Sequence, residues 1–150
     1  MPPDWKTAQE QSAKTAKWAV TMTKVRIRQL IAKTKWQLVT FVGPKGGESV
    51  GIVDLLAIRK NHSPGKDDLK RGDLFEVVLI QVKGGAARFP SADELERLRI
   101  VGTAYNAKAV LLAQWKKGMQ APFYSLTSIS SERIGKDAWT LLSSPAEVFW

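Results

Sequence analysis

Apolar and polar residues alternate with a helical period in the first part of the chain. Through residues 4–34, apolar residues recur every three or four positions and neither Gly nor Pro interrupts them, which predicts one long amphipathic helix. The stretch "VTMT" at 20–23 is β-prone and would allow a break there. The apolar face of this helix is predicted to comprise Ala16, Ala19, Val20, Thr23, Ile27, Leu30 and Ile31.

Runs rich in Val, Ile and Leu follow the helix and predict three β-strands. These strands are expected over 36–43, 50–60 and 74–83. The segment 61–73 is too polar for a core and contains Pro64 and Gly65, so it is expected to be a surface loop. Two strands joined by a single loop form most simply an antiparallel hairpin.

A capping box formed by Ser91 and Glu94 marks the start of a second helix. The Ser91 hydroxyl would accept the Glu94 amide, and the Glu94 carboxylate would reach back to the amide of Ser91. Residues 107–115 are apolar almost throughout, as in a strand covered on both faces. The helix itself is predicted from Leu95, Leu98, Val101 and Tyr105, with Asn106 as its stop.

The order helix, three strands, helix, strand predicts an α/β sandwich with a mixed sheet. The second helix should connect the third and fourth strands as a right-handed crossover. A length of 150 residues fits a single domain, with a core over about 1–115 and a C-terminal extension over 116–150. In the extension, "FYSLT" and "WTLLS" are expected to be edge strands and "SPAEVFW" a short closing segment.

Charge is the first unusual feature of the composition. The 23 Lys and Arg exceed the 14 Asp and Glu, and the resulting net charge of +9 favours a polyanionic partner, above all nucleic acid. The chain has no cysteine for disulfides and no apolar stretch typical of a signal peptide or membrane span, so we expect a cytoplasmic protein. The residues expected to contact nucleic acid are Lys14, Lys17, Lys24, Arg26, Arg28, Lys66, Lys70, Arg71, Lys116 and Lys117.

Three polar side chains stand out within the apolar strands. Because side chains alternate along a strand, Gln81 and Lys83 share one face near the end of the third strand. Asp54 lies near the start of the second strand, and these two ends are neighbours in an antiparallel hairpin. The three side chains should therefore converge at one sheet edge, beside Gly84-Gly85, whose bare backbone leaves room for a bulky ligand.

This combination of groups suits phosphodiester hydrolysis. Carboxylate, amide and backbone oxygens form a hard ligand set that fits Mg²⁺ or Mn²⁺. A neighbouring Lys can stabilise a metal-bound hydroxide or the charge that develops on a phosphate. A basic surface around such a site predicts a nucleic acid as the substrate.

The pattern resembles the PD-(D/E)xK nuclease superfamily, in which an Asp at a strand start precedes an acidic-x-Lys triplet at the end of the next strand. The predicted element order is similar to its restriction-endonuclease-like core over about residues 1–115. "GIVDLLAI" with "VVLIQVKGG" looks like the Gln-x-Lys branch found in Mrr-type restriction endonucleases, and is also similar to Holliday-junction-resolvase-like proteins. The resemblance implies a metal-dependent endonuclease that acts on double-stranded or branched DNA, in a fold that commonly forms homodimers.

The resemblance also implies a role for each residue of the motif. Asp54 would be the main metal ligand, with the amide oxygen of Gln81 and the backbone carbonyl of Val82 beside it. Lys83 would position or polarise the attacking water. A further acid would come from Glu10 in the first helix or from Glu48.

Two departures from the family pattern leave other interpretations open. Val53 stands where the family has Pro, and Gln81 replaces the acid that relatives often keep, so Asp54 is the only sure anionic ligand. A nucleic-acid-binding module with a degenerate site is therefore the main alternative, and a protein whose basic surface meets an acidic protein partner is the third. Taken alone, Gln81 and Lys83 could also be the solvated end of a strand.

Overall fold

The protein is described here by a computed structural model that covers residues 5–41, 51–63, 65–85, 88–115, 122–127 and 133–149. The elements follow the predicted order, with two 3-10 helices added near the C-terminus. In chain order they are α1 (Trp5–Ile31), β1 (Gln37–Thr40), β2 (Leu55–Lys60), β3 (Phe75–Gly84), α2 (Ala92–Ala104), β4 (Ala109–Trp115), β5 (Phe123–Leu126), η1 (Gly135–Ala138), β6 (Trp139–Leu141) and η2 (Pro145–Phe149).

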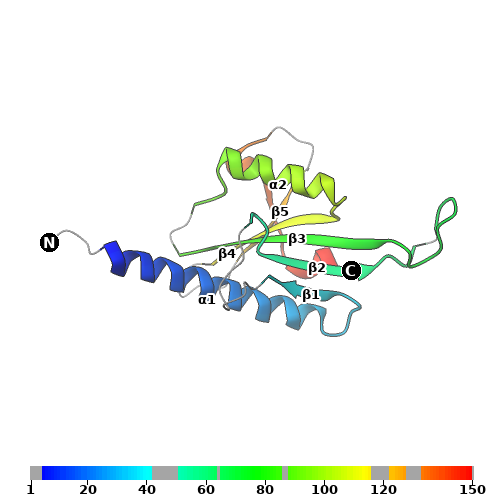
Figure 1. Ribbon diagram of the computed structural model, residues 1–150, viewed down its shortest axis with the longest axis horizontal. Coiled ribbons are helices and arrows are strands. Elements are labelled where there is room, and N and C mark those ends of the chain that lie inside the picture. The colour runs from blue at the N-terminus through cyan, green and yellow to red at the C-terminus, as the bar shows by residue number, and fades with distance from the viewer. Residues whose placement is uncertain are drawn as a thin grey trace.

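The strands form one six-stranded mixed sheet whose spatial order equals the chain order. β3 and β4 are parallel and all other neighbours are antiparallel. α2 links the two parallel strands, and α1 and α2 cover opposite faces of the sheet (Figure 1). The predicted α-β-β-β-α-β order, the mixed sheet and the hairpin between β2 and β3 are therefore confirmed.

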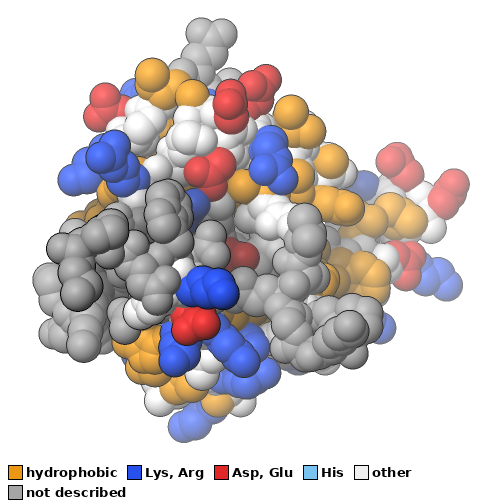
Figure 2. Space-filling view, turned by 60° about the vertical axis from the view of Figure 1, so that its left-hand side comes forward, with side chains coloured by type: hydrophobic (Ala, Val, Ile, Leu, Met, Phe, Trp, Pro, Cys, Tyr) orange, Lys and Arg blue, Asp and Glu red, His pale blue; other side chains and the backbone are white. Residues whose placement is uncertain are grey.

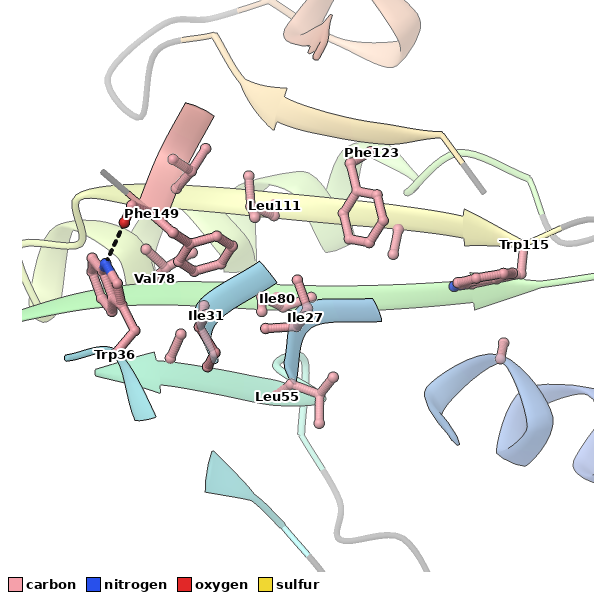
Figure 3. Packing of buried hydrophobic residues seen from close by; sticks show 14 residues of the cluster. Ile27, Ile31, Trp36, Leu55, Val78, Ile80, Leu111, Trp115, Phe123 and Phe149 are labelled. Atoms are coloured by element: carbon pink, nitrogen blue, oxygen red, sulfur yellow. Dashed lines mark hydrogen bonds between the residues drawn. The ribbon is translucent and has the colours of Figure 1, made fainter. Parts of the chain in front are cut away.

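The sheet separates two hydrophobic clusters. On the α1 face, Ile27 packs with Val78, Ile80 and other fully buried side chains, as Figure 3 shows. On the α2 face, Leu95 and Leu98 pack against Leu79 and residues of β4. The residues of β3 thus alternate between the two clusters, as a strand with two covered faces requires.

The C-terminal residues complete the sheet and the core. "WTLLS" forms the edge strand β6 as predicted, but β5 lies between β4 and β6 and is not at the edge. The closing segment "SPAEVFW" contains η2, which brings Phe149 against Trp36. The indole of Trp36 donates to the Phe149 carbonyl at 2.9 Å, so η2 is fixed to the core on the α1 face (Figure 3).

α1 runs without a break through "VTMT". The Thr21 and Thr23 hydroxyls each donate to the carbonyl four residues earlier, at 3.0 and 2.8 Å, which satisfies their polar atoms within the helix. Ala19 and Ile27 are fully buried as predicted, whereas Ala16 is exposed and does not belong to the apolar face.

α2 begins with the predicted capping box. The Ser91 side chain accepts the Glu94 amide at 3.2 Å, and Glu94 Oε1 accepts the Ser91 amide at 3.3 Å. Asn106 takes a positive φ of 48° just after the helix, which fits its predicted role as the stop. Tyr105 is 68% exposed, so it does not extend the apolar face. Within the described residues, no helix is long and apolar enough to cross a membrane.

A hydrogen bond between α1 and β4 gives the first prediction. The Trp115 indole donates to Thr23 Oγ1 at 2.6 Å in the buried core. Thr23→Val keeps the shape of the side chain but leaves this donor without its acceptor, so we expect a loss of about 1–3 kcal/mol in the free energy of unfolding. Chemical denaturation measures it, with exposed Thr21→Val as the control, expected within about 0.5 kcal/mol of wild type. Equal losses in both variants would contradict the role of the buried bond.

Candidate active site

Asp54 lies at the end of the β2–β3 hairpin, directly before β2. Its amide donates to the Ile80 carbonyl at 2.9 Å and so continues the ladder by one residue. Its carboxylate Oδ2 accepts the Val82 amide at 2.7 Å. Because the amide and carbonyl of one residue in an extended strand point to the same side, the Val82 carbonyl also points toward the Asp54 side. The structure therefore brings Asp54 beside the "QVK" segment.

Gln81 and Lys83 project from the same face of β3 as Leu79, toward α2. Gln81 is only 4% exposed, so it is not a solvated strand end. Its amide nitrogen Nε2 donates to Glu94 Oε2 at 3.3 Å, and Lys83 Nζ forms an ion pair with the same oxygen at 2.8 Å. The first turn of α2 thus lies directly over the end of β3.

Glu94 is a site residue that the sequence reasoning missed, because the capping box accounted for it fully. The hydrogen bond from Lys83 lowers the pKa of Glu94, the Ser91 amide and the Gln81 side chain lower it further, and partial burial opposes them. Glu94 therefore remains a carboxylate at neutral pH. One signal was present in the sequence: Glu94 precedes Leu98 by four residues and so lies on the sheet-facing side of the helix.

The oxygen atom of the Gln81 side chain, Oε1, has no hydrogen-bond partner although it is buried. A buried acceptor without a donor is costly. Because Gln81 Oε1 lies at the strand end where Asp54 is held, a cation is expected to bind between these oxygens. Gln81 Oε1, Asp54 and the Val82 carbonyl are all hard oxygen donors, which fit Mg²⁺ or Mn²⁺. Among the described residues, no three His, Cys, Asp or Glu side chains gather into a metal-binding group, so the fit depends on the amide and the backbone.

Of the other two acids expected as ligands, the structure describes Glu10. Glu10 is exposed on α1, the helix on the opposite face of the sheet from α2. Glu48 lies outside the described residues. Glu76, whose side chain lies on the opposite face of β3 from that of Gln81, forms an ion pair with Arg59 at 2.6 Å near the other end of the strand.

Gly84 does not leave room for a ligand, contrary to the expectation from the sequence. A Cβ at Gly84 would lie 2.9 Å from the Ala19 Cβ and 3.2 Å from the Thr15 carbonyl oxygen of α1. Gly85 has a φ of +63°, and a Cβ there would also meet Thr15 at 3.0 Å. The two glycines therefore allow the close approach of α1 to the end of β3.

The basic residues of α1 lie mostly along one side. At 100° per residue, Lys14, Lys17, Lys24 and Arg28 fall on one flank of the helix over about 21 Å, and Arg26 points to the far side. Lys14, Lys17 and Arg28 are exposed, while Lys24 and Arg26 are partly buried. Lys14 directly precedes Thr15, which contacts the end of β3, so this basic flank begins where α1 packs against that strand end, on the face of the sheet opposite α2.

The cations of the β2–β3 loop lie away from the site. Lys66, Lys70 and Arg71 follow the end of β2 that is opposite Asp54, and the eight steps from Phe75 to Lys83 span about 26 Å. Figure 1 shows this loop protruding from the far end of the sheet. Residues 61–73 also contain three Asp, Asp67, Asp68 and Asp73, which balance the three cations. The remaining predicted contacts, Lys116 and Lys117, lie outside the described residues.

Figure 2 shows the end of the molecule at which α1 begins and β3 ends. An acidic side chain lies at the bottom of a recess near the centre of this face. Lys and Arg side chains gather below the recess, on the side of α1, with an acidic side chain among them, and acidic and basic side chains also mix above it, on the side of α2 (Figure 2). The distribution is that of a recessed carboxylate with a positive surface on one side.

Comparisons with known proteins add a likeness of overall fold. The chain matches no protein-family model and no curated protein. It is similar to the solved structure of Hjc, a Holliday junction resolvase from the archaeal hyperthermophile Archaeoglobus fulgidus, with 18% identity and a TM-score of 0.46. The match covers 87% of this chain and 99% of that one.

The contact between Gly84 and α1 gives the second prediction. Gly84→Ala should force α1 away from the end of β3 and lower the free energy of unfolding by about 1–3 kcal/mol, measured by chemical denaturation. Adding Ala19→Gly removes the nearest clash and should recover part of this loss, although glycine within a helix costs about 1 kcal/mol. Wild-type stability in Gly84→Ala alone would show that the helix does not pack this closely.

Proposed function

We propose that the protein is a metal-dependent DNA endonuclease of the PD-(D/E)xK type. The observation that supports this most directly is the buried, unpartnered Oε1 of Gln81, next to the strand end at which Asp54 is fixed. An amide oxygen in that position could coordinate a metal ion. The proposed metal ligands are Asp54, Gln81 and the Val82 carbonyl.

Each side chain has a defined task in this proposal. Mg²⁺ or Mn²⁺, when bound, would stabilise negative charge on the phosphate and lower the pKa of a water molecule. Lys83, which shares a strand face with Gln81, would position the attacking water and stabilise the charge that develops on the phosphate. Asp54 is held by the Val82 amide, so its carboxylate is oriented before any substrate arrives.

DNA is the proposed substrate because of the charge around the recess. The basic flank of α1 begins beside the end of β3 and offers phosphate contacts that carry no sequence information. A recess beside such a flank suits double-stranded or branched DNA. The proposal includes a homodimer because the superfamily that the sequence resembles commonly forms homodimers.

A second candidate function is nucleic-acid binding without cleavage. The observation that favours it is the ion pair of Lys83 with Glu94, which occupies the ammonium that would otherwise act on the phosphate. Here the same basic flank would bind nucleic acid, but the site would not hydrolyse it.

Cleavage assays separate the two functions. Plasmid, single-stranded and branched DNA are incubated with Mg²⁺, Mn²⁺ or EDTA. We expect metal-dependent cutting by the wild type, reduced by about 10²-fold or more in Asp54→Asn and Lys83→Ala. Asp68→Asn and Lys66→Ala make the same chemical changes in the distant loop and should cut normally.

The other outcomes are also decisive. Salt-sensitive DNA binding by the wild type with no cutting under any metal condition would reject the nuclease and support the binding module. No DNA binding at low salt would reject both and leave an acidic protein partner.

Salt-dependent binding tests the basic flank. Lys14→Ala/Lys17→Ala removes two exposed cations of this flank and should make the negative slope of log K against log salt less steep by about 2. Lys66→Ala/Lys70→Ala removes the same charge from the opposite end of the sheet and should leave the slope near its wild-type value. Equal changes in the two double variants, measured by fluorescence anisotropy, would show that only net charge matters.

A further inference from the structure

Glu94 links the first turn of α2 to both polar side chains of β3. Its Oε1 closes the capping box by accepting the Ser91 amide at 3.3 Å. Its Oε2 accepts from Lys83 at 2.8 Å and from Gln81 at 3.3 Å. One oxygen of the Glu94 carboxylate therefore caps α2, and the other accepts hydrogen bonds from the two polar side chains of β3.

The contact with Glu94 decides which atom of Gln81 faces the rest of the site. A carboxylate only accepts hydrogen bonds, so the amide nitrogen of Gln81 must be the atom that faces it. The reverse orientation would set two acceptor oxygens against each other. Gln81 Oε1 must then point away from Glu94, and this is the buried oxygen that lacks a partner.

Glu94 also changes the charge of the site. Asp54, Gln81 and Lys83 together carry no net charge, because the carboxylate and the ammonium cancel. Glu94 is paired with Lys83 and brings the total to −1, which favours a divalent cation. The negative charge that the strand lacks at position 81 thus comes from the helix above it.

We propose that Glu94 is the second acid of this site and acts as a positioning residue, which turns the Gln81 carbonyl toward the metal and balances the charge of Lys83. The inference rests on the proposed metal-dependent function. Neighbours that orient a metal ligand commonly change metal affinity by about 10–100-fold when they are removed. Glu94→Gln removes the negative charge and lets either end of the amide at position 94 face Gln81. The orientation of the Gln81 carbonyl and the charge balance with Lys83 should therefore be lost together.

Mn²⁺ and Mg²⁺ affinities of the DNA-free protein test this inference, measured by isothermal titration calorimetry. Glu94→Gln should weaken Mn²⁺ binding by at least about 10-fold. Glu96→Gln makes the same change at an exposed acid of the same helix and should bind within about twofold of the wild type. Ser91→Ala breaks the cap but not the site, so it should lower the thermal midpoint by about 3 °C and leave Mn²⁺ affinity unchanged.

A double-variant cycle tests the link to Gln81 itself. In Gln81→Glu the ligand at position 81 has two equivalent oxygens, so its orientation no longer depends on Glu94. Adding Glu94→Gln to Gln81→Glu should therefore weaken Mn²⁺ binding far less than it does in the wild-type background, because only the contribution of the charge is then lost. The same loss in both backgrounds would show that Glu94 acts only through its charge at a distance and would overturn the positioning role.

The remaining outcomes separate this inference from the proposed function. A wild-type protein that binds Mn²⁺ and cuts DNA, but whose Glu94→Gln variant matches Glu96→Gln, keeps the nuclease and rejects the role of Glu94. A loss in Ser91→Ala as large as that in Glu94→Gln would show that Glu94 only caps the helix. A wild-type protein that binds neither metal at millimolar concentration would overturn the proposed function, and this inference with it.

Discussion

The hydrogen bond from the Val82 amide to the Asp54 carboxylate, 2.7 Å long, fixes the one point on which the polar residues converge. It forms because the antiparallel register of β2 and β3 pairs Leu55 with Ile80 and so brings the residue before β2 next to Gln81. A shift of one residue would move the polar side chains of β3 to the α1 face. The buried side chains on both faces of β3 prevent such a shift.

The two helices add different properties to this sheet end. α1 packs so closely against the end of β3 that only a glycine fits at position 84, and it carries a row of mostly exposed cations along one flank. α2 begins over the end of β3 and brings Glu94 to Gln81 and Lys83. The parallel pairing of β3 with β4 is what requires α2 to cross the sheet there, so topology alone brings a helix start to this place.

Features set by local pattern could be predicted from the sequence. The period of two in β3 gave the shared face of Gln81 and Lys83, and the capping box gave the start of α2. Features set by distances between elements could not. Whether Gly84 faces a ligand or Ala19 depends on how closely α1 packs, and Glu94 reaches Lys83 only because of the height of α2 above the sheet. Charge alone predicts that the cations of the β2–β3 loop contact nucleic acid, whereas their distance from Asp54 follows from the hairpin, which places them at its opposite end.

The protruding β2–β3 loop offers a place to observe the protein at work. The chain has no cysteine, so a single Cys at exposed Ser63 would be the unique thiol for a fluorescent or spin label. β3, which spans about 26 Å from Phe75 to Lys83, lies between that loop and the candidate site, and distances of this order suit energy transfer. A dye on the DNA could then report when a strand enters the recess, without any change to the side chains that line it.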